Sequence, residues 1–256
     1  MARRDATSRR LFVRAPLAAG GRVDLDPAQA NHLVNVLRRR DGDDVLVFNG
    51  RDGEWRARLV AAGRRRWQVD VGDRTRPQPR PPDLHYLFAP LKQARLDYMV
   101  QKAVEMGAGR LRPVLTRRGQ VARFNRDRAE ANAIEAAEQC GILSLPAIDD
   151  PVALDIMIDG WPETAGDRRI VFCDEADGGS DPLSVLAALT PSPLAVLVGP
   201  EGGFAEDERR RLRACAFVTA IPLGPRVLRA DTAAVAALAL VQALLGDWRA
   251  GTPAPR

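Results

Sequence analysis

Short runs of apolar side chains alternate with turns that contain glycine or asparagine over the first 75 residues, a pattern typical of short β-strands. One helix interrupts them. Asp26 can cap its start, Pro27 suits its first turn, and Leu33 and Leu37 belong to one apolar face. The pattern predicts a small β-barrel module with strands over residues 11–14, 22–25, 43–48, 54–59 and 67–71.

The segment 75–83 separates this module from the rest of the chain. Four of its nine residues are prolines, which exclude a helix or a central strand and favour an extended spacer. We therefore expect a β-barrel domain over residues 1–76, a proline-rich linker over 77–83 and a second domain over 84–256.

Beyond the linker, strand-like and helix-like segments alternate, which predicts an α/β domain with a parallel sheet covered by helices. The expected strands are 84–89, 111–115, 170–173, 194–198 and 218–222. The expected helices cover 95–106 and 128–140 and begin again at Pro182, Ala205 and Thr232.

The last predicted helix, over residues 232–245, is apolar on nearly every face. A helix of this kind must be covered on all sides, either within its own chain or by a partner subunit. The sequence leaves both readings open, and a homodimer is one of them.

Composition narrows the class of protein. The chain has 256 residues of which 46% are hydrophobic, so it can bury a substantial core and is not a disordered protein. Its three cysteines show no C-x-x-C spacing, which predicts neither a disulfide framework nor a metal site, and suggests small core residues in a reducing cytoplasm. No apolar run approaches the ~20 residues of a membrane helix, so no membrane partner is expected.

The charge of the chain is unevenly distributed. Residues 1–128 contain 28 Lys and Arg against 14 Asp and Glu, whereas residues 129–256 contain 10 against 19. All but two of the cations are arginine, whose planar fork suits phosphate oxygens. The first half therefore suits a polyanion such as RNA.

Several enzyme classes lose support because their motifs are absent. There is no G-x-x-x-x-G-K-[ST], no G-x-G-x-x-G after a strand, no H-E-x-x-H and no G-x-S-x-G. The two histidines, His32 and His85, lie in apolar patterns and are interpreted as core or interface residues.

Two loops carry the candidate chemistry. Residues 199–204 follow an apolar strand and combine three glycines with Glu201, and residues 221–232 follow the next strand and contain Gly224, Arg229 and Asp231. Glycines allow close approach of a ligand, and ligands of open α/β sheets bind at this edge. Taken separately, the first loop could be a plain turn and the second a helix cap; together they predict one apolar pocket.

These two loops resemble those of the SPOUT class of S-adenosylmethionine-dependent RNA methyltransferases. Within that class the chain resembles the bacterial 16S ribosomal RNA (uracil-N3) methyltransferase family nearly end to end. The stretches that carry the resemblance are 10–13, 32–38, 42–50, 101–107, 138–141, 199–203 and 223–229, followed by Thr232 and Ala233. Two positions depart from the family pattern: Ile142 stands where the family has arginine, and Asp231 where it has glutamate.

The resemblance implies a PUA-like barrel, a SPOUT-type parallel sheet with a trefoil knot and helices on both faces, and a homodimer. It implies methylation of N3 of one uridine of 16S ribosomal RNA (uridine 1498 of the decoding region), within the small ribosomal subunit, with S-adenosylmethionine as cofactor. Carried over by position, the cofactor site would comprise Val198, Gly199, Gly203, Ile221, Leu223, Gly224, Val227 and Leu228.

Arg229 is the candidate to stabilise negative charge on the base as N3 loses its proton, as an oxyanion site does. Asp231 or Glu201 could accept that proton or orient a water, and orientation is the stronger expectation for both. The expected RNA contacts are Arg10, Arg14, Arg38, Arg39 and Arg40, with residues 64–66 as a second basic cluster. The alternatives are a SPOUT methyltransferase acting on another RNA and a non-catalytic RNA-binding protein.

Overall fold

The computed structural model describes residues 9–64, 66–121, 123–175, 181–190 and 192–249. These residues divide into two compact units: the first comprises those from 9 to 80 together with 137–145, and the second comprises those from 81 to 136 and from 146 to 249. The predicted barrel thus gains a short segment from the middle of the chain, which the sequence pattern did not indicate.

The first unit is built on one five-stranded sheet in the order β1-β3-β4-β5-β2. β1 is parallel to β3 and the other neighbouring strands are antiparallel. Its apolar core contains Val47, Leu59 and Val69, none of which is exposed. The strands are β1 (Arg10–Phe12), β2 (Arg22–Asp24), β3 (Asp44–Phe48), β4 (Glu54–Ala61) and β5 (Trp67–Arg76).

The helix of the first unit begins as predicted and then changes type. The side chain of Asp26 caps α1 (Pro27–Asn31) by accepting from the Gln29 N–H at 2.8 Å. The chain continues as a π-helix, η1 (His32–Val36), whose wider turn displaces the side chains from the expected α-helical stripe. Leu33 is buried, but His32 is exposed, so of its two expected places, core or interface, the core is wrong.

The second unit is an α/β domain with a parallel sheet, as predicted. Its strands follow the order β12-β10-β11-β6-β7-β8, with β9 alongside β7, and every pair recorded among them is parallel. They are β6 (Leu84–Phe88), β7 (Ala108–Leu115), β8 (Ala147–Ile148), β9 (Val152–Ala153), β10 (Arg169–Cys173), β11 (Leu194–Val198) and β12 (Val218–Ile221).

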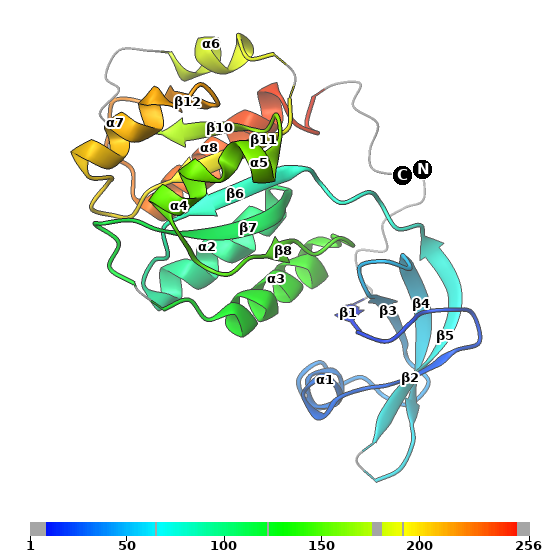
Figure 1. Ribbon diagram of the computed structural model, residues 1–256. Coiled ribbons are helices and arrows are strands. Elements are labelled where there is room, and N and C mark those ends of the chain that lie inside the picture. The colour runs from blue at the N-terminus through cyan, green and yellow to red at the C-terminus, as the bar shows by residue number, and fades with distance from the viewer. Residues whose placement is uncertain (1–8, 65, 122, 176–180, 191, 250–256) are drawn as a thin grey trace. The chain divides into compact units, whose positions relative to one another are not determined.

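Helices pack on both faces of this sheet (Figure 1). Leu87, Phe172 and Leu197 of one face join an apolar cluster with α4 (Leu154–Asp159), α5 (Trp161–Ala165) and α7 (Glu206–Ala214). The opposite face meets α2 (Gln93–Glu105) and α8 (Ala230–Leu244), which also pack against each other. α3 (Arg126–Cys140) and α6 (Pro182–Ala187) complete the described helices. The pattern of apolar and polar positions did not predict α4 and α5.

The strongly apolar α8 is largely covered by its own unit. Ala233, Ala237, Leu238 and Val241 are buried there, while Thr232 and Ala243 are exposed. No helix of the described residues is long and apolar enough to cross a membrane.

Candidate functional site

A pocket opens at the carboxyl ends of β10, β11 and β12, the edge at which ligands of parallel sheets bind. Seven of the eight predicted cofactor residues line it: Val198, Gly199, Gly203, Leu223, Gly224, Val227 and Leu228. The structure thus brings the two loops together at one site.

Ile221 is the exception among the predicted cofactor residues. It is the last residue of β12, its side chain is fully buried, and it does not line the pocket. Its carbonyl oxygen accepts the Asp174 N–H at 3.0 Å. Ile221 therefore supports the pocket from behind instead of forming its wall.

The first loop is held by close packing and by a turn. The Gly203 N–H donates to the Pro200 carbonyl at 2.9 Å, and Gly203 has a φ of +65° that favours glycine. A Cβ at Gly199 would lie 2.5 Å from the ring of Phe204, which is itself packed edge-on against Phe172 in the core. The first loop therefore lines the pocket with the backbone of its glycines.

The second loop forms the apolar wall opposite. Leu223 and Leu228 line the pocket, and Gly224 has a φ of +90° with open space where its Cβ would be. Val227 lines the rim and is 81% exposed, so it leaves an apolar surface available to a bound molecule.

The pocket has a third wall, at the end of β10, which was not predicted from the sequence. Cys173, Asp174 and Glu175 line the pocket together with Arg209 of α7. The sequence contained a signal for this wall, because these residues lie at the end of the predicted strand 170–173 or directly after it, at the edge where ligands bind. Burial raises the pKa of the Cys173 thiol to about 12, so this cysteine is not a nucleophile at neutral pH.

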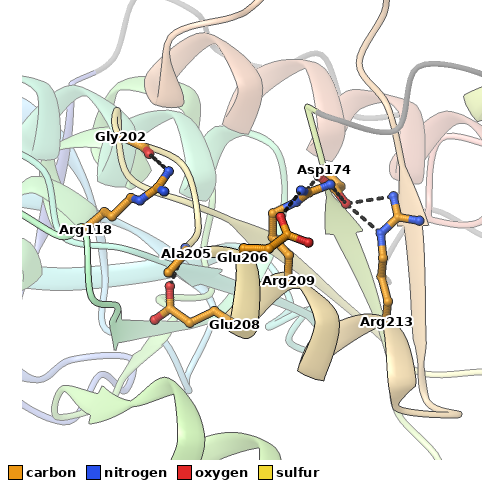
Figure 2. Close-up of polar contacts among 8 residues, drawn as sticks. All are labelled: Arg118, Asp174, Gly202, Ala205, Glu206, Glu208, Arg209 and Arg213. Carbon is orange, nitrogen blue, oxygen red and sulfur yellow. Dashed lines mark hydrogen bonds and ion pairs between the residues drawn. The ribbon is translucent and has the colours of Figure 1, made fainter.

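Asp174 is the centre of a buried ion cluster (Figure 2). Its side chain is 1% exposed and accepts hydrogen bonds from Arg209 Nε at 3.0 Å and Arg213 Nε at 2.8 Å. These two hydrogen bonds attach α7 to the end of β10. Arg209 also pairs with Glu206, one turn earlier on α7, whereas Arg211 pairs with Asp155 and Asp159 of α4.

Glu208 fixes the start of α7. Its side chain is buried and accepts the Ala205 N–H at 2.8 Å (Figure 2). It also accepts the Arg117 N–H at 2.9 Å. One carboxylate thereby joins the loop before α7 to the segment that follows β7.

The three predicted catalytic residues lie beside the pocket in two ion pairs. Arg229, the N-cap residue of α8, donates to Asp231 at 2.8 Å, and Arg95 of α2 donates to Glu201 at 3.0 Å. The hydrogen bond from Arg229 lowers the pKa of Asp231. A carboxylate with a lowered pKa is a weaker base, which favours the orienting role for Asp231.

One predicted RNA contact is wrong. The side chain of Arg10 is only 10% exposed and donates from Nε to the buried Glu54 at 2.8 Å, so binding a phosphate would take it away from the carboxylate that it shares with Arg76. Arg14, Arg38 and Arg40 are exposed and Arg39 is half-buried. Arg38 has a φ of +54°, unusual for a residue with a side chain.

The remaining polar candidates separate by environment. Burial, then Arg168 and Arg110, lower the pKa of His85 to about 4, and the side chain, expected in the core or an interface, is half-buried in β6. Cys140 is exposed, so the expectation of a core cysteine is wrong there. Residue 65 of the second basic cluster lies outside the described residues, and Arg64 and Arg66 are exposed.

Comparison with protein families agrees with this two-unit organisation. The family described as RNA methyltransferase PUA domain matches residues 25–71, and the family described as RNA methyltransferase domain matches residues 78–242. Fold and site together thus define the class: an RNA methyltransferase domain that follows its own PUA domain.

Named relatives specify the family further. Ribosomal RNA small subunit methyltransferase E of Rickettsia conorii is 29% identical over 93% of this chain and 96% of its own, and that of Mycobacterium tuberculosis is 30% identical over 88% of each. The crystal structure of the Neisseria gonorrhoeae protein of this name, bound to S-adenosylmethionine, has 26% identity, covers 94% of this chain and 100% of its own, and superposes with a TM-score of 0.81. The chain belongs to the ribosomal RNA small subunit methyltransferase E family.

Proposed function

We propose that this protein transfers a methyl group from S-adenosylmethionine to N3 of one uridine in 16S ribosomal RNA, within the small ribosomal subunit. The observation that carries the proposal is the Arg229–Asp231 pair beside a glycine-lined pocket at the carboxyl ends of β10, β11 and β12. The S-adenosylmethionine bound by the Neisseria relative supports the cofactor assignment.

The pocket residues fit this cofactor. Its walls are apolar at Val198, Leu223 and Leu228, and the Glu175 carboxylate faces the same space. Apolar walls suit a flat purine ring, and carboxylates favour a cationic ligand over an anionic one. Side chains at Gly199 and Gly203 would collide with residues that line the cradle, because their Cβ atoms would lie 2.5 Å from Phe204 and 2.6 Å from Glu175.

When bound, S-adenosylmethionine supplies an electrophilic methyl group on its sulfonium. The protein must align uridine N3 with that methyl group and stabilise the negative charge that spreads over O2 and O4 as the N3 proton leaves to water. Arg229 can do the second task, because Asp231 holds one of its nitrogens while its side chain remains 62% exposed. Asp231 and Glu201 orient arginines in this scheme and do not act as bases.

The RNA would also be held by the first unit. Arg14 and the Arg38 to Arg40 run are the proposed phosphate contacts there, since phosphate neutralisation supplies most of the affinity for RNA without reading its sequence. Arg10 is excluded from this set by its pairing with Glu54.

Three further properties belong to the proposal. A trefoil knot at the two pocket loops agrees with the strand order, in which β12 is next to β10 and not next to β11. A homodimer would cover the exposed side of α8, and light scattering at micromolar concentration tests it. A cytoplasmic location is the third, and within the described residues the cysteines form no disulfide bond.

Two experiments test the function. Calorimetry with S-adenosylmethionine should show binding, and its absence would favour the non-catalytic RNA-binding alternative. Mass mapping of ribosomal RNA from cells that lack the protein should show the loss of one methyl group on a 16S uridine. A loss from transfer RNA instead would favour the same fold acting on another RNA.

A further inference from the structure

Two arginines from different segments converge on adjacent residues of the first pocket loop. Arg95, at the start of α2, donates from Nη1 to the Glu201 carboxylate at 3.0 Å. Arg118, just after β7, donates from Nη1 to the Gly202 carbonyl at 3.1 Å (Figure 2). Two positive charges that are remote in sequence therefore flank the turn at residues 200–203.

The turn has other interactions that hold it in place. The Gly203 N–H bonds to the Pro200 carbonyl, the Phe204 side chain is buried, and Glu208 caps the following helix at Ala205. These contacts fix the loop at both ends of the turn. The turn therefore does not depend mainly on Arg95 and Arg118 for its conformation. These two arginines are available for another role.

Both guanidinium groups keep unused donors on the solvent side. The side chain of Arg95 is 41% exposed and Arg118 is also exposed. A guanidinium carries five N–H donors, and within the described part of the chain each of these two makes hydrogen bonds only through Nη1. The remaining donors form a planar fork that suits the oxygens of a phosphate.

The charge around the pocket entrance also favours an anion. Arg229 lies close enough to Glu201 for that carboxylate to contribute to the raised pKa of Arg229. Arg95, Arg118 and Arg229 thus face two carboxylates, Glu201 and Asp231, which leaves one net positive charge beside the pocket. Arg95 and Arg118 belong to residues 1–128, the half of the chain that is basic overall, whereas Arg229 and both carboxylates belong to the acidic half.

We propose that Arg95 and Arg118 bind phosphates of the RNA strand on either side of the uridine that enters the pocket. This inference rests on the proposed function and adds a second RNA contact, within the methyltransferase unit itself. A base that is turned out of its stack must be held by its backbone, and two forks beside the entrance would hold the flanking phosphates. Arg95 and Arg118 are positioning residues in this account.

The test measures RNA affinity as a function of salt, with an unmodified 16S RNA transcript and the full-length protein. We expect Arg95→Ala and Arg118→Ala each to reduce the slope of log K against log salt by about 0.7 to 0.9, the value for one lost phosphate contact. Affinity for S-adenosylmethionine, measured by calorimetry, should change less than twofold.

Matched variants separate phosphate binding from a structural effect. Arg95→Gln and Arg118→Gln retain a donor for the turn and lose the charge, so they should show the same reduced slope and also serve if an alanine variant does not fold. Arg211→Ala is the control, because that side chain is 39% exposed and pairs with α4 instead. It should leave the slope unchanged.

An unchanged salt slope in the glutamine variants would overturn the proposal. If these variants also bound the cofactor more weakly, the two arginines would have a structural role in holding the turn. Failure of the proposed function gives a different result: the unaltered protein would then bind no S-adenosylmethionine, whatever its salt slope.

Discussion

Arg229 donates a hydrogen bond of 2.8 Å to Asp231, two residues further along the chain, and the two side chains differ sharply in exposure. Asp231 is 10% exposed, whereas Arg229 is 62% exposed. Asp231 also accepts the Thr232 N–H at 3.0 Å, so the carboxylate is held at both oxygens. An exposed cation is thereby attached to a buried, fixed anion at the first turn of α8.

The first prediction concerns this pair. Replacing Arg229 by alanine should lower the single-turnover methylation rate by about 10²- to 10³-fold, the usual effect of losing one charge-stabilising donor. Asp231→Asn should lower it less, because Arg229 remains but is no longer held by a charge. Cofactor affinity serves as the control and should be unchanged in both variants; near-normal methylation by Arg229→Ala would contradict its role.

The second prediction concerns Gly199. Alanine there would place Cβ 2.5 Å from the Phe204 ring, so we expect a loss of about 1–3 kcal/mol in the free energy of unfolding and weaker cofactor binding. Gly160→Ala is the control, since its Cβ would lie 3.4 Å from the nearest atom. Urea unfolding of the two variants gives the comparison; equal stabilities would show that Phe204 can move aside.

The third prediction concerns Asp174. Asparagine there removes the buried negative charge that Arg209 and Arg213 share. Breaking a buried ion pair costs about 3–5 kcal/mol, and we expect the lower end because both arginines can reach water. Urea unfolding measures the loss, and calorimetry should show weaker cofactor binding. A variant of normal stability would mean that the cluster contributes nothing net.

The fourth prediction separates two kinds of arginine in the first unit. Arg10→Ala should destabilise the protein by about 1–3 kcal/mol, because it removes the closest cation from the buried Glu54. Replacing Arg38, Arg39 and Arg40 together by alanine should leave stability nearly unchanged and reduce the salt slope of RNA binding. Thermal unfolding and RNA titration distinguish the two; a reduced slope in a stably folded Arg10→Ala protein would restore Arg10 as a contact.

The fifth prediction concerns pH. The pKa of His85 is about 4 in the folded protein and about 6.5 in an unfolded chain, so the unfolded state takes up a proton first as pH falls. The stability that depends on neutral His85 is therefore complete above about pH 6.5 and is lost progressively towards pH 4. The free energy of unfolding of His85→Gln should depend less on pH across this window. Identical pH profiles would show that His85 is not responsible.

The sequence by itself determined the elements and the edge of the sheet that carries the site. Alternating strands and helices, with glycine-rich loops after the strands at 194–198 and 218–222, are local features, and local periodicity specifies which face is apolar and where a strand ends. This is why seven of the eight expected cofactor residues line one pocket and why the expected pair Arg229 and Asp231 lies beside it.

Only the tertiary structure decided which charges meet. Arg95 pairs with Glu201 across 106 positions, Arg10 with Glu54 across 44, and Arg209 with Asp174 across 35. Partners at such separations depend on strand order and crossovers, which leave no periodic trace in the sequence. The same reason explains the errors: Arg10 has the same local signature as an RNA-binding arginine, and only its burial against Glu54 shows that its charge stabilises the fold instead.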